Sequence, residues 1–202
     1  MARIATDVVL LPDDAMMNRA IEINQQIGRE YSAEIVLDRE NCLPHISLAM
    51  GCVEQREVDA VGRVLEQIAQ EIPLGPLTAT GIQNPEGRKA AVLEIERTEK
   101  LQRLHERVMQ GMKPFFRHEV KDAMFYDDIV AQTSVDWVRT YPQEASYEHF
   151  SPHITLGYGR ARPSFSLPIL FDAVGLALCH LGNHCTCRKV LVREAVLVKR
   201  EA

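Results

Sequence analysis

The sequence predicts an α+β fold made of two similar lobes related by a pseudo-twofold axis. Segments patterned like strands alternate with amphipathic helical segments, and no low-complexity tract interrupts them. A strand–helix unit followed by Pro-His-Ile-Ser-Leu in the first half is echoed by a similar unit followed by Pro-His-Ile-Thr-Leu in the second. With 202 residues, we expect residues 1–202 to form a single domain of two intertwined lobes.

The first half opens with a strand and a helix. Residues 3–11 (RIATDVVLL) predict a strand, and Pro12-Asp13-Asp14 then offers a turn and a helix cap. Apolar residues spaced by three and four then predict an amphipathic helix over residues 15–29. Residues 33–37 look extended. Residues 44–53 (PHISLAMGCV) alternate as a strand does, with a proline tolerated at the start.

The middle of the chain predicts a helix followed by two strands. Apolar residues step by three and four through residues 58–72, and Pro73 ends that run. Residues 74–84 are expected to be extended. A turn at residues 84–87 (NPEG) leads into a second extended segment over residues 89–95.

A further helix precedes the segment that is hardest to interpret. Thr98 is a candidate cap for a helix that carries one apolar stripe and ends at Pro114. Within residues 115–150 the periodicity is weak, and residues 126–138 are the best candidate for a helix. The last strands are expected at residues 151–159, 171–181 and 184–198, the final two being joined by a two-residue turn at Gly182-Asn183.

Charge and composition narrow the class of partner. The formal net charge is −5 and the pI is near 5.8, whereas proteins that grip long nucleic acids are usually basic. No apolar run reaches membrane-spanning length. The N-terminus lacks the pattern of a secretory signal. We therefore expect a cytoplasmic protein that binds a small nucleotide or an RNA terminus, with no duplex nucleic acid, no membrane and no obligate protein partner.

The cysteines predict thiols and not a disulfide framework. Their number is odd in a chain without an export signal, which favours the reduced state for all five: Cys42, Cys52, Cys179, Cys185 and Cys187. The last three lie beside two histidines and invite a zinc interpretation. A two-residue turn would place His180, Cys185 and Cys187 on one face and Cys179 with His184 on the other. We therefore predict no metal site there.

The strongest functional signal is the repeated motif itself. Because residues two apart in a strand point to the same face, His45 and Ser47 share one face, as do His153 and Thr155. The intervening aliphatic residues point to the core. If the two strands lie side by side, two imidazoles and two hydroxyls face one cleft.

This set of side chains suits phosphoryl transfer without a metal. A neutral imidazole can accept a proton from water, while a protonated one donates to the departing ribose oxygen. The hydroxyls of Ser47 and Thr155 can donate hydrogen bonds to the non-bridging oxygens, where charge accumulates in the transition state.

These paired His-x-[Ser/Thr]-x motifs resemble those of the 2H phosphoesterase superfamily, which includes bacterial 2′-5′ RNA ligase-like proteins and cyclic nucleotide phosphodiesterases. The resemblance covers most of the chain, and residues 174–191 look like the family's closing hairpin. It implies a bilobal fold in which two antiparallel sheets line a central cleft and helices pack outside. It also implies hydrolysis or transfer at 2′,3′-cyclic, 1″,2″-cyclic or 2′-5′ phosphodiester bonds, without metal, cofactor or covalent intermediate.

The resemblance assigns roles to individual residues. The family's catalytic pair falls on His45 and His153, the second as base and the first as acid. Its phosphate-binding hydroxyls fall on Ser47 and Thr155. Many ligase-like relatives carry an arginine soon after the second motif, and here Gly157-Tyr158-Gly159 delays it to Arg160.

Tyr158 and Arg160 are further candidates for substrate binding. Tyr158 would share the face of His153 only if the strand continued through Gly157 without a bulge. The long segment 115–150 departs from compact relatives and is expected to be an insertion or lid.

Three alternatives stay open. The same cleft could join RNA ends by the reverse reaction, or it could bind nucleotides with little turnover. A metal-dependent hydrolase could instead use His45, His149 and His153.

Overall fold

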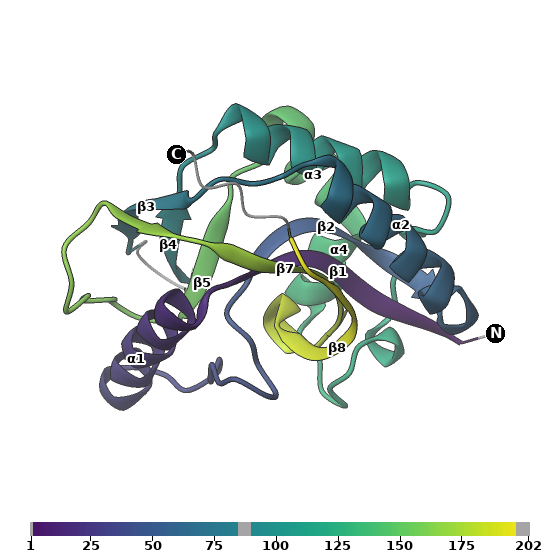
Figure 1. Ribbon diagram of the computed structural model, residues 1–202. Coiled ribbons are helices and arrows are strands. Elements are labelled where there is room, and N and C mark those ends of the chain that lie inside the picture. The colour runs from purple at the N-terminus through teal and green to yellow at the C-terminus, as the bar shows by residue number, and fades with distance from the viewer. Residues whose placement is uncertain (1, 85–89, 197–202) are drawn as a thin grey trace.

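The computed structural model describes residues 2–84 and 90–196 and shows one curled, antiparallel sheet with helices on both faces (Figure 1). Eight strands run in the order β6-β3-β4-β5-β2-β1-β7-β8. The strands are β1 (Arg3–Pro12), β2 (Ile46–Glu54), β3 (Leu77–Gln83), β4 (Ala91–Ile95), β5 (His153–Gly157), β6 (Ile169–Phe171), β7 (Ala173–Leu181) and β8 (Cys187–Glu194). The α-helices of the described part are α1 (Asp14–Glu30), α2 (Val58–Glu71), α3 (Glu99–Met112) and α4 (Gln132–Glu144).

The sheet consists of two four-stranded halves that join at the two motif strands. β2 and β5 pair through the residues Ile46 and Ile154, which lie at the centres of the two motifs. The α+β class and the antiparallel pairing agree with the prediction. The expectation of two separate sheets is not confirmed, because this central pair makes the two halves one sheet.

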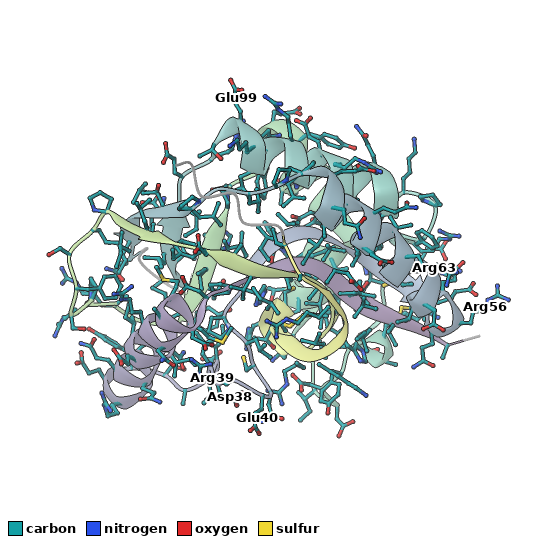
Figure 2. The ribbon with its side chains drawn as sticks, viewed as in Figure 1. Asp38, Arg39, Glu40, Arg56, Arg63 and Glu99 are labelled. Atoms are coloured by element: carbon teal, nitrogen blue, oxygen red, sulfur yellow. A yellow bond between two sulfur atoms is a disulfide. The ribbon has the colours of Figure 1, made fainter. Side chains whose placement is uncertain are left out.

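Side chains on the two faces of the sheet build separate cores. The main core lies between one face and the helices α1, α2 and α3, and it contains buried residues from both halves of the sheet. Charged side chains point outward from these helices, among them Arg63 on α2 and Glu99 on α3 (Figure 2). A smaller core lies on the opposite face, where Val135, Val138 and Tyr141 of α4 pack against the sheet.

Helix caps form where the sequence predicts them. The side chain of Asp13 accepts a hydrogen bond from the Met16 backbone N–H at the start of α1. Thr98 does the same for the Leu101 N–H at the start of α3. The predicted turn at residues 84–87 lies mostly outside the described residues.

Residues 33–37 do not form the predicted extended strand. The backbone N–H of Leu37 donates to the side chain of Asn24 on α1, and Asn24 itself donates to the carbonyl of Ile35. A buried side-chain amide therefore satisfies the backbone groups that a neighbouring strand would otherwise satisfy.

The helix predicted over residues 126–138 forms later, as α4. Its last turn contains Pro142, which has no N–H to donate to the carbonyl of Val138 four residues earlier. The imidazole of His118 lies 3.3 Å from that carbonyl oxygen and donates to it instead. A hydrogen bond from a distant residue thus lets the helix run through a proline.

The last two strands pair in another register than the sequence suggests. Leu181 lies opposite Cys187, because the short 3₁₀ turn Asn183–Cys185 replaces the predicted two-residue turn. Cys179 and Cys187 then lie with their Cα atoms 5.4 Å apart and form a disulfide. The expectation that all five cysteines are reduced is therefore wrong for this pair.

Candidate active site

The two repeated motifs line one cavity on the side of the sheet that carries α4. His45 and Ser47 lie at the start of β2, and His153 and Thr155 lie on β5. All four line a cavity of about 820 Å³. The alternation predicted from sequence is present, since all four are partly buried while the intervening isoleucines are fully buried in the main core.

The two imidazoles are held in the same way. His45 Nδ1 lies 2.8 Å from the carbonyl oxygen of Leu43, and His153 Nδ1 lies 2.8 Å from that of Ser151. A carbonyl oxygen only accepts hydrogen bonds, so each Nδ1 carries a proton. Nε2 is therefore the atom of each ring that is available for proton transfer.

Burial lowers the pKa of both imidazoles. The pKa of His45 falls from 6.5 to about 4, mainly because the charged ring would be desolvated and, to a smaller extent, because His153 lies nearby. The pKa of His153 is lowered for the same main reason. Neutral imidazoles suit a general base near neutral pH. A general acid at the same site needs a further source for its proton.

Asp7 is a site residue that the motif pattern does not reveal. It lies on β1, its side chain is fully buried, and its Oδ2 is 3.8 Å from Nε2 of His45. Burial raises the pKa of Asp7 well above its usual value, while the hydroxyl of Ser47 and backbone groups of β2 lower it in part. The signal in the sequence is a carboxylate within an otherwise largely apolar strand, where charged residues are rare.

Tyr158 lines the same cavity because the strand contains a bulge, whereas we expected it to do so only without one. β5 and β4 shift register between Thr155 and Gly157, so a bulge interrupts the alternation. Without the bulge, Tyr158 would point to the other face, because residues 153, 155 and 157 would share one face. The expectation that Tyr158 needs an unbulged strand is therefore wrong. Arg160 is exposed and is not among the described residues that line the cavity.

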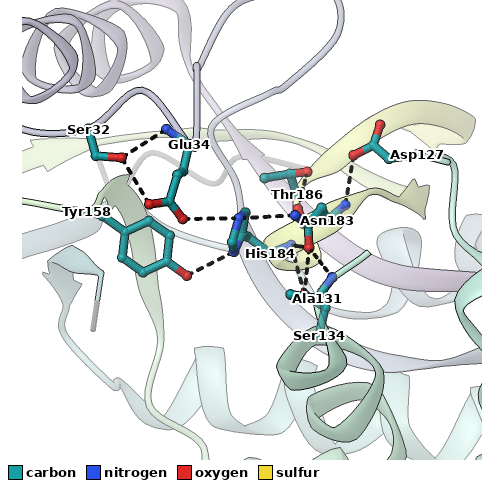
Figure 3. Close-up of polar contacts among 9 residues, drawn as sticks. All are labelled: Ser32, Glu34, Asp127, Ala131, Ser134, Tyr158, Asn183, His184 and Thr186. Carbon is teal, nitrogen blue, oxygen red and sulfur yellow. Dashed lines mark hydrogen bonds and ion pairs between the residues drawn. The ribbon is translucent and has the colours of Figure 1, made fainter. Parts of the chain in front are cut away.

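A polar network fixes the far wall of the cavity (Figure 3). The hydroxyl of Tyr158 lies 3.0 Å from Nδ1 of His184, whose Nε2 is 3.7 Å from a carboxylate oxygen of Glu34. His184 belongs to the turn Asn183–Cys185, and the first residue of that turn accepts a hydrogen bond from the Ala131 backbone N–H. The turn thereby links the start of α4 to the wall that holds Tyr158.

Within residues 115–150, α4 contributes part of the cavity wall. Trp137 and Tyr141 of α4 line the cavity, and Trp137 is 40% exposed. That residues 115–150 form an insertion or a lid stays a prediction. The described residues contain no group of three or more His, Cys, Asp or Glu side chains placed to hold a metal ion. They also contain no helix that is both long and apolar enough to cross a bilayer.

Comparisons with known proteins place this chain in a family. The family model of the 2′-5′ RNA ligase superfamily matches residues 25–201. The structure of TT0787 from Thermus thermophilus is similar, with 14% identity, a TM-score of 0.53, and coverage of 98% of this chain and 100% of that one. Escherichia coli LigT in its apo form is 14% identical with a TM-score of 0.45, over 99% of this chain and 100% of that one. A comparison with curated protein sequences finds no match.

The family model covers both motifs and the strands from β2 to β8, whereas β1 precedes the matched residues. The TT0787 structure supports the same fold over nearly the whole chain. The resemblance to the 2H phosphoesterases is confirmed at the level of the family: this chain belongs to the 2′-5′ RNA ligase superfamily.

Proposed function

We propose that this protein is a metal-independent phosphodiesterase that hydrolyses a cyclic, 2′,3′-type, or 2′-5′-linked nucleotide phosphodiester. The observation that carries the proposal is the matched pair of motifs around one cavity. Two imidazoles with free Nε2 atoms and two hydroxyls, Ser47 and Thr155, line it from two adjacent strands. Each element has a role in transferring a phosphoryl group to water.

In the proposed reaction His153 is the base and His45 is the acid. Nε2 of His153 takes a proton from the attacking water, while Nε2 of His45 delivers one to the departing ribose oxygen. The hydroxyls of Ser47 and Thr155 donate hydrogen bonds to the non-bridging oxygens as negative charge builds there. No covalent intermediate is needed, because water attacks phosphorus directly.

The walls of the cavity favour a nucleotide over a simple phosphate ester. Trp137 and Tyr158 both line the cavity and offer aromatic surfaces there. Aromatic rings stack on nucleobases without strong sequence preference, worth about 1–3 kcal/mol per base. We propose that these rings hold the base or bases next to the scissile phosphate.

The test is a panel of 2′,3′-cyclic and 2′-5′-linked nucleotides assayed with excess chelator. The wild-type protein should turn over at least one of them. His45→Ala and His153→Ala should each lower kcat by about 10²–10⁴-fold, the usual contribution of a general acid or base. Circular dichroism of both variants should match that of the wild type, because neither ring belongs to the main core.

His149→Ala separates this mechanism from the metal-dependent alternative. His149 lines the cavity, yet its side chain is 58% exposed and it lies outside both motifs. The two-histidine mechanism leaves this variant active in chelator. A metal-dependent mechanism would replace the proposal under two conditions. The chelator would have to abolish activity that a metal ion then restores, and His149→Ala would have to be inactive.

End-joining is a second candidate because a 5′-hydroxyl can replace water as the nucleophile and use the same two proton transfers, and the matching family takes its name from RNA ligation. RNA halves with a 2′,3′-cyclic phosphate and a free 5′-hydroxyl test it directly. A 2′-5′-linked product would support ligation. Tight nucleotide binding without turnover of any substrate would instead indicate a binding module.

A further inference from the structure

A buried carboxyl group distinguishes the first motif from the second. Asp7 Oδ2 is 3.8 Å from His45 Nε2, and the Asp7 side chain has no exposed surface. Neither carboxyl oxygen has a hydrogen bond of standard geometry within the described part of the chain. A buried carboxyl group without well-formed hydrogen bonds costs free energy, so its position beside a reacting atom points to a function.

Comparing the strand partners of the two motifs shows that the second motif has no equivalent of Asp7. Val9 pairs with Ser47 as Val92 pairs with Thr155, and both strand pairs contain a bulge at the next step. Beyond the bulge, Val8 pairs with Ala49 and Ala91 pairs with Gly157. Val8 therefore corresponds to Ala91, and the residues that precede them, Asp7 and Ala90, correspond to each other. A methyl group therefore stands where the carboxyl would be.

Electrostatics favours one proton for Asp7 and His45 together. A buried carboxylate with only poorly formed hydrogen bonds and a buried imidazolium without a counter-charge are each costly. The pKa of Asp7 is raised by burial and that of His45 is lowered by it, so neither group is stable in its charged form alone. One proton on the pair, on either the carboxyl or the ring, avoids an isolated buried charge.

Other titratable groups reach this pair from three directions. His153 faces His45 across the cavity and lowers its pKa. Burial raises the pKa of Tyr141 on α4 and of Cys185 in the 3₁₀ turn, and the charge of Asp7 raises both further. Both groups therefore stay neutral near pH 7, which leaves the proton to Asp7 and His45.

We propose that Asp7 is a positioning residue that shares one proton with His45 and thereby makes this histidine the general acid. This inference rests on the proposed hydrolysis. When the phosphodiester binds beside His45, its negative charge favours the proton on Nε2. That proton passes to the departing ribose oxygen as the P–O bond breaks, and His153 takes a proton from the attacking water. The proton on His153 then returns to the Asp7–His45 pair through solvent, so the protein is regenerated.

The first test follows both groups directly by NMR. In the wild-type protein, the side-chain carbon of Asp7 and the ring nitrogens of His45 should show a common titration step, because coupled groups titrate as a pair. Asp7→Asn should remove that step from His45 and lower its pKa by about one to three units, the effect of losing an opposite charge at this range. His153 should be little affected.

Thr6→Val is the matched control. Thr6 precedes Asp7 on β1, is also fully buried, and donates a hydrogen bond of 2.9 Å to the carbonyl of Gly51. The substitution removes a buried polar group from the same strand without touching His45, so the common step should persist. Independent titration of Asp7 and His45 in the wild-type protein would overturn the proposal without any variant.

The second test is kinetic. Loss of the shared proton source should move the alkaline limb of the pH profile of kcat/KM to lower pH in Asp7→Asn. Activity at pH 8 should fall by about 10–100-fold, less than on removing the acid itself, while KM changes little. An unchanged profile in Asp7→Asn would overturn the role of Asp7. No turnover by the wild-type protein would refute the proposed hydrolysis, whereas the NMR experiment would still decide the pairing.

Discussion

At the scale of single residues, the chemistry of the cavity follows from how its two histidines are buried. Each ring is anchored by the carbonyl two residues earlier, so the chain that places the imidazole also fixes its tautomer. Burial then lowers the pKa of both rings and disfavours their charged forms. The repeated motif predicts that these two rings and the hydroxyls of Ser47 and Thr155 belong to one site. It could not predict Asp7, because the carboxyl reaches His45 from another strand through a register that only the folded sheet defines.

The burial of His45 predicts a loss of stability in mild acid. Its pKa is about 4 in the folded protein and 6.5 in the unfolded chain, so the unfolded chain binds more protons between these values. The stability contribution is complete above pH 6.5 and is lost as the pH falls towards 4, by up to about 3 kcal/mol. His45→Gln should remove this part of the pH dependence.

The measurement is urea unfolding of the wild type and His45→Gln from pH 7 to pH 4. The two curves of unfolding free energy against pH should diverge as the pH falls, with the variant losing less. His153 and His105 contribute in the same direction in both proteins, because burial lowers the pKa of each. Parallel curves over the whole range would show that His45 can be protonated without cost.

At the scale of elements, local pattern predicts most helices and strands and fails where a distant residue supplies a missing interaction. The caps at Asp13 and Thr98 depend on neighbouring residues, and both form. Residues 33–37 look extended by composition, yet Asn24 binds their backbone. α4 continues through Pro142 because the side chain of His118 binds the carbonyl that the proline leaves free. Neither partner can be recognised from periodicity.

α4 gives the clearest prediction at this scale. Trp137 projects from it into the cavity and stays 40% exposed, so its truncation should not unfold the helix. If it stacks on a nucleobase, Trp137→Ala should lose about 1–3 kcal/mol of binding, or roughly 5–150-fold in KM. The value of kcat should change less, since Trp137 belongs to neither motif.

Tyr126→Ala is the control for a large exposed ring outside the cavity. Tyr126 is 49% exposed and packs against His180 and Arg188. The KM of Tyr126→Ala for nucleotides should match that of the wild type in steady-state kinetics. Its Kd for a product nucleotide, measured by calorimetry, should match as well. Equal KM values for both variants would contradict a stacking role for Trp137.

At the scale of the whole molecule, the repeated motif predicts a duplicated architecture but not how the two halves of the sheet are joined. The strand pairs β1–β2 and β4–β5 contain bulges at equivalent steps relative to the two motifs. The union of the halves depends on the pairing of Ile46 with Ile154, and a contact between such distant residues leaves no local trace in the sequence. The same applies to the disulfide between β7 and β8, whose register depends on a turn longer than the glycine suggests.

The junction predicts that the halves unfold together. Ile154 is fully buried in a main core that contains residues from both halves, so Ile154→Ala should destabilise the whole molecule by about 2–5 kcal/mol. Fluorescence of Trp137, the one tryptophan of the chain, reports on α4, and far-UV circular dichroism reports on all elements. In urea, the two signals should give the same midpoint in the wild type. In the variant they should again coincide, at a lower urea concentration.

Leu170→Ala is the control, at a residue that is 65% exposed on the edge strand β6. It should change the free energy of unfolding by no more than about 0.5 kcal/mol. If Ile154→Ala separated the two midpoints, the halves would be independent folding units, and the cavity between them would depend on docking and not on one continuous core.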